Sequence, residues 1–117
     1  MQRSRFYILV ALIFLSISLT VFAQSQNPRQ LFERARMLDE SNQNLPEAIK
    51  LYSQVVKQAQ EQRALAARAQ LRVGLLYERL GRKAEAQRAF QAVVSQYADQ
   101  TEVARQAQGK IAKPGVP

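Results

Sequence analysis

The chain contains no cysteine and no histidine among its 117 residues. Without cysteine it can form neither a disulfide framework nor a reactive thiol. Without histidine it lacks the commonest general base, which is also the commonest metal ligand. Its four glycines are isolated from one another, so there is no glycine-rich phosphate loop. We therefore predict no enzyme activity and no cofactor or metal.

The nine acidic residues are scattered along the chain and form no cluster suited to acid–base catalysis. Their only adjacent pair is Asp39-Glu40, at the end of an expected helix beside a polar turn. We interpret this pair as a solvent-exposed helix terminus.

The N-terminus has the layout of a secretory signal peptide. Residues 1–5 hold two arginines and no acid, and residues 6–15 (FYILVALIFL) are an uninterrupted apolar run. Val21 and Ala23 then occupy the two positions that a signal peptidase reads. We predict that residues 1–23 are removed after Ala23 and that the remaining protein is soluble in the periplasm or secreted.

The alternative to cleavage is a retained membrane anchor. The segment from Phe6 to Phe22 is shorter than the ~20 residues that a spanning helix needs. Its far end is polar, and no basic residue follows until Arg29. We favour cleavage, so the only membrane contact expected is through the signal peptide before its removal.

The processed chain is basic. Loss of Arg3 and Arg5 lowers the formal net charge from +8 by two, to +6. Such a surplus suits an acidic protein, an anionic membrane or a nucleic acid. Export makes a nucleic acid the least suitable partner.

The remaining sequence reads as an all-α domain. Residues 24–27 form a polar linker, residues 28–112 are rich in good helix formers, and residues 113–117 (KPGVP) are expected to be an unstructured tail. No run alternates with the two-residue period of a strand. Apolar residues at helical spacing mark four buried faces: Leu31, Ala35, Leu38; Ala48, Tyr52, Val55, Ala59; Ala69, Val73, Leu76, Leu80; and Ala86, Phe90, Val93, Tyr97.

Three breaks between these helices have local signals. Asn27-Pro28 pairs a capping side chain with a proline at the first helical position. Residues 41–46 (SNQNLP) form a polar turn, and Gly81 suits a left-handed helix end. A further break, near residues 60–63, is predicted from an internal repeat. A shift of 38 residues aligns Glu47, Ala48, Val55, Val56, Gln58, Gln62, Ala66, Ala69 and Gln70 with identical residues.

The second repeat carries a recognisable motif. It reads Gln70-x2-Val73-Gly74-x2-Tyr77, followed by Ala86-x3-Phe90. This resembles the tetratricopeptide repeat, W-x2-L-G-x2-Y … A-x3-F, with the tryptophan, leucine and closing proline replaced by Gln70, Val73 and Ala98. A looser version reads Leu31-x2-Arg34-Ala35-x2-Leu38, then Ala48-x3-Tyr52. The resemblance implies antiparallel helical hairpins stacked as a short solenoid, with two repeats and a capping helix near residues 101–112.

The resemblance also implies a role in binding peptides or protein surfaces on the concave face, and a bacterial envelope setting. The residues expected on that face are Arg29, Phe32, Arg36, Arg68, Leu71, Arg72, Leu75 and Arg79. Such a groove would be basic with an apolar floor, suited to an acidic peptide. Alternatively, the arginines only solubilise a helix face while Leu71 and Leu75 pack on the last helix. A self-associating module (a homo-oligomer) and a binder of anionic lipid or envelope polymer also stay open.

Overall fold

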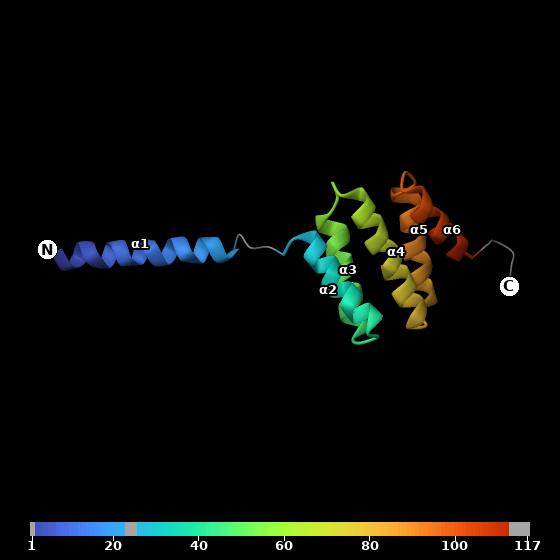
Figure 1. The fold of residues 1–117 in the computed structure, drawn as a ribbon, viewed down its shortest axis with the longest axis horizontal. Coiled ribbons are helices and arrows are strands. Elements are labelled where there is room, and N and C mark those ends of the chain that lie inside the picture. Colours follow the sequence, from blue (N-terminus) through green and yellow to red (C-terminus); the bar gives the residue numbers. More distant parts are fainter. Residues whose placement is uncertain (1, 23–25, 113–117) are drawn as a thin grey trace.

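The protein is described by a computed structural model covering residues 2–22 and 26–112, with side chains for residues 2–12 and 26–112. The described residues form six helices and no strand (Figure 1). The helices are α1 (Gln2–Phe22), α2 (Pro28–Glu40), α3 (Leu45–Gln58), α4 (Arg63–Arg79), α5 (Lys83–Gln96) and α6 (Thr101–Lys110). The predicted linker at residues 24 and 25 and the predicted tail at residues 113–117 lie outside the described residues.

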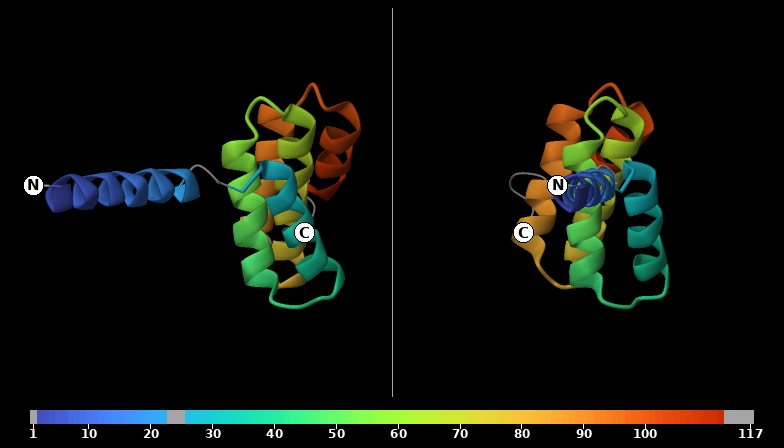
Figure 2. Two further views of the ribbon diagram at one scale, coloured as in Figure 1. Left: turned by 60° about the vertical axis from the view of Figure 1, so that its left-hand side comes forward. Right: turned by 90° about the vertical axis from the view of Figure 1, so that its left-hand side faces the viewer.

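From α2 onward, each helix packs against the next one along the chain, and α4 also contacts α2 and α6. Figure 2 shows these helices running up and down, so that α2 with α3 and α4 with α5 form two antiparallel hairpins. α6 follows the second hairpin and closes the array (Figure 1). The predicted all-α solenoid of two hairpins and a final helix is confirmed.

The breaks between helices follow the local signals of the sequence. The side chain of Asn27 caps α2 by accepting a 3.0 Å hydrogen bond from the backbone nitrogen of Arg29. The break predicted near residues 60–63 lies between α3 and α4, and Gly81 has a φ of +75° at the turn after α4. The predicted turn at residues 41–46 is shorter, because Leu45 and Pro46 belong to the first turn of α3, where proline is tolerated.

The predicted core stripes are buried, with two differences. Leu38 is half-buried against the core, and Leu80 is 38% exposed. The prediction for Leu80 was wrong because this residue follows the last residue of α4, at the turn where the chain reverses. Gly74 faces the ring of Phe90, and a Cβ there would lie 2.5 Å from Cε1 of that ring. The close approach of α4 and α5 therefore requires glycine at this position.

The core is complete without α1. Both clusters of buried apolar residues are formed by α2–α6 and the short segments around them. Among the described residues, α1 packs against none of these helices. The core of the α2–α6 domain therefore does not use α1, and we expect this domain to fold without it.

α1 coincides with most of the predicted signal peptide, and the predicted cleavage site at Ala23 lies outside the described residues. Its apolar side chains from Phe6 to Leu12 are exposed, apart from Val10, which is half-exposed. Within the fully described residues, no helix is both long and apolar enough to cross a membrane.

Candidate functional site

The first helix of each hairpin and the final helix together line a groove. Its central hollow has a volume of about 600 Å³, with α4 as its floor and α2 and α6 as its walls. The lining residues are Phe32, Arg36, Glu40, Tyr52, Arg68, Leu71, Arg72, Leu75, Glu102, Val103 and Gln106. α5 contributes no residue to it.

The apolar floor is shared with the core. Phe32 and Leu71 are only 5% and 7% exposed, so only a small part of each side chain reaches the groove. Leu71 belongs to the second core cluster together with Ala107 of α6, and Leu75 packs against that cluster, in line with the alternative that both leucines pack on the last helix. Leu75 and Val103 are half-buried and line the groove, so part of their apolar surface is open to a partner.

Arg68 lies where two hollows meet. Its guanidinium carbon is 5.1 Å from the centre of the Phe32 ring, a cation–π contact. A second hollow, of about 450 Å³, shares Phe32 and Arg68 with the first and extends to Arg29. Within the described part of the chain, neither arginine has a carboxylate partner. Arg68 is therefore the unpaired positive charge at the centre of the groove.

Arg36 is neutralised by its own helix. It forms ion pairs of 2.8 Å with Glu33 and 2.6 Å with Glu40, one turn to either side. Spacings of three and four residues place these side chains next to one another on α2. Its charge is therefore largely satisfied without a partner.

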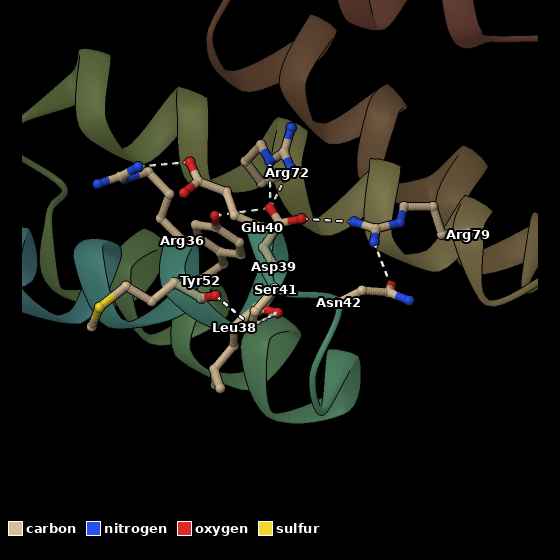
Figure 3. Close-up of polar contacts among 10 residues, drawn as sticks. Arg36, Leu38, Asp39, Glu40, Ser41, Asn42, Tyr52, Arg72 and Arg79 are labelled. Carbon is tan, nitrogen blue, oxygen red and sulfur yellow. Dashed lines mark hydrogen bonds and ion pairs between the residues drawn. The ribbon is translucent and has the colours of Figure 1, made fainter.

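Asp39 is the centre of a buried polar cluster that joins α2 to α4 (Figure 3). It is 2% exposed and accepts hydrogen bonds from Tyr52 Oη (3.0 Å), Arg72 Nε (2.8 Å) and Arg79 Nη1 (2.7 Å). The interpretation of Asp39 as a solvent-exposed terminus was therefore wrong. A carboxylate is stable in such a position only when charged donors surround it.

The cluster changes the chemistry of its members. Burial raises the pKa of the Tyr52 hydroxyl above its ordinary value, and the negative charge of Asp39 raises it further. Arg79 also donates to Asn42 Oδ1 at 2.6 Å and does not line the groove. Arg72 and Arg79 of α4 thus both donate to Asp39 of α2, and these contacts link the two hairpins.

The structure brings together most of the predicted partner-binding residues. Those that line the central hollow are Phe32, Arg36, Arg68, Leu71, Arg72 and Leu75, while Arg29 lines the second hollow. Sequence reasoning placed Tyr52 in the core alone and missed Glu40, Glu102, Val103 and Gln106. The internal repeat held a signal for α6, because the 38-residue shift places Gln106 on Arg68. The described residues contain no group of acidic side chains arranged to hold a metal ion.

The match to a known family falls on the second hairpin. Residues 68–99 match the family model of the tetratricopeptide repeat. This segment runs from the middle of α4 through α5 to the turn before α6, and it includes Gly74 and Phe90. Tetratricopeptide repeats are generally protein–protein interaction modules. No curated protein and no solved structure matches the chain.

Proposed function

We propose that this protein is a non-catalytic interaction module that binds a peptide or protein segment in the groove between α2, α4 and α6. The observation that carries this proposal is the groove itself, with half-buried Leu75 and Val103 beside the unpaired Arg68. Of the helices that form it, α4 lies largely within the segment that matches the tetratricopeptide repeat, and α6 directly follows that segment. Apolar anchors with a few placed charges are typical of peptide-binding surfaces.

The experiment that tests this proposal is site-specific photo-cross-linking in intact cells. A photoreactive amino acid replaces Leu75 in the groove or, as a control, the exposed Gln91 on α5. We expect a recurrent polypeptide adduct from position 75 and none from position 91. Arg68→Glu should abolish the adduct, whereas Arg88→Glu on α5 should leave it intact.

Other patterns of cross-linking would contradict the proposal. Adducts only between copies of this chain would favour a self-associating module. Equal adducts from positions 75 and 91 would show that partners do not use the groove. Loss of every protein adduct together with binding to anionic vesicles would favour a lipid or polymer ligand.

We further propose that the module works outside the cytoplasm, in the bacterial cell envelope. The support is the sequence of residues 1–23 together with an α2–α6 domain whose core does not use α1. The mass of the exported protein should correspond to a chain that begins at Gln24. A mass that still includes residues 1–23 would instead support the retained anchor.

A further inference from the structure

The charges that line the groove are not equally available to a partner. Arg72 is bound by the buried Asp39 beneath it, and Arg36 is bound by Glu33 and Glu40. On the opposite wall, Glu102 forms a 2.8 Å ion pair with Arg105. Of the charged residues that line the central hollow, Arg68 alone has no oppositely charged partner in the described part of the chain. The groove is therefore much less basic than its count of arginines indicates.

The carboxylates on the walls restrict what can bind. Glu40 lies on the α2 wall and Glu102 on the α6 wall of the same hollow. Glu40 shares Arg36 with Glu33, so these three side chains keep one net negative charge, whereas Glu102 is offset by Arg105. A segment with several acidic residues would bring like charge close to this surplus on the α2 wall, which is unfavourable. One carboxylate placed at Arg68 would avoid it and could accept two hydrogen bonds from the guanidinium.

The apolar surface lies next to this charge. Leu75 is two helical turns from Arg68 along α4, and Val103 faces the same hollow from α6. A smaller hollow of about 290 Å³ continues past Leu71 and Leu75 to Gly109. A bound segment thus meets the positive charge of Arg68 and, two helical turns farther along α4, an apolar surface.

Resting on the proposed function, we infer that the groove selects a segment with one carboxylate beside apolar side chains, and not a polyacidic segment. The carboxylate pairs with Arg68, displacing its contact with the Phe32 ring or adding to it. The apolar side chains cover Leu75 and Val103. Charge complementarity at a single position would then set the register of the bound segment.

The test is selection from a library of random short peptides displayed on phage, with residues 24–117 as the immobilised target. The wild-type domain should enrich peptides that carry a single Asp or Glu next to apolar residues. Arg68→Glu should enrich the same apolar pattern with Lys or Arg at the acidic position. Arg68→Lys should keep the acidic preference, and Arg88→Glu, on a helix outside the groove, should select as the wild type does.

Affinities of the enriched peptide then measure the effect. Arg68→Glu should weaken its binding at least about tenfold, and replacing the peptide's acid by lysine should restore binding to that variant. Helix content by circular dichroism verifies that each variant is folded.

Failure of the inference and failure of the proposed function would give different results in this selection. Enrichment of peptides with several acids, or the same peptides with Arg68→Glu, would overturn the inference and leave a peptide-binding groove. The absence of any enriched peptide would overturn the proposed function and the inference with it.

Discussion

The two hairpins reach the same arrangement of helices by different local chemistry. The first hairpin, α2–α3, begins each helix with an asparagine whose side chain accepts a backbone hydrogen bond. In the second, α4–α5, neither helix has a side-chain cap. The first turns through Asn42 and Asn44 at positive φ, whereas the second uses Gly81. The shared fold is therefore specified by packing positions more than by any one turn or cap.

The hairpins also differ where their helices touch. In the second hairpin Gly74 allows the Phe90 ring to lie directly against α4. Ala35 occupies the matching position of the first hairpin and is fully buried there. Tyr52 occupies the place of Phe90 and adds a hydroxyl, which donates to Asp39. The first hairpin thus has a buried hydrogen bond between its two helices, and the second has closer packing.

The largest effect is expected from removing the acceptor at the centre of the cluster. Asp39→Ala leaves the buried Tyr52 hydroxyl without its acceptor and leaves Arg72 and Arg79 unpaired. Loss of one partner from a buried ion pair is strongly destabilising, so we expect a decrease of about 3 kcal/mol in the free energy of unfolding. Urea denaturation of residues 24–117 measures it.

Asp99 supplies the matched control for this substitution. It forms an ion pair with Arg63 at 2.5 Å, but both side chains are about half exposed. Since solvent screens such a pair, Asp99→Ala should be much less destabilising than Asp39→Ala. Equal losses from the two substitutions would show that burial of Asp39 does not matter.

The second largest effect is expected in the second hairpin. Gly74→Leu places a side chain where even a Cβ would be 2.5 Å from the Phe90 ring. Overpacking of this kind should lower the stability by about 1–3 kcal/mol, seen as a lower melting temperature. Gly109→Leu is the control, because nothing lies within 4 Å of a Cβ there. If Gly74→Leu melted with the wild type, the close approach of α4 and α5 would be in doubt.

The smallest effect is expected from making the first hairpin resemble the second. Tyr52→Phe removes the hydroxyl that binds Asp39 and should cost about 1 kcal/mol at neutral pH. Because folding raises the pKa of Tyr52, the folded state keeps this proton to higher pH than the unfolded state. The stability from Tyr52 is therefore complete below pH about 10 and is lost as the pH rises further.

Melting curves at increasing pH test whether the stability contributed by Tyr52 is lost in alkali. The difference in melting temperature between wild type and Tyr52→Phe should narrow above pH about 10. A difference that is constant or grows with alkali would contradict the proton linkage.

The sequence predicted the helices and their buried faces well, because apolar spacing and the glycine and asparagine signals act locally. It included Gly74 and Phe90 in the repeat motif but did not predict that the Phe90 ring lies against Gly74. It did not predict the burial of Asp39, because the covering residues, Arg72 and Arg79, come from a helix more than thirty residues away. The charge of the groove was overestimated for the same reason, since arginines were counted without their partners.

Asp39 also affects how the domain unfolds. The acceptor belongs to α2 and its two arginines to α4, so the cluster exists only while both hairpins are folded and docked. In repeat proteins, stability divides into contributions within each repeat and contributions from the interfaces between neighbours. The ion pairs of Asp39 contribute only to the interface between the two hairpins. They couple the folding of one hairpin to that of the other, and we expect this coupling to favour a single unfolding transition over stepwise melting.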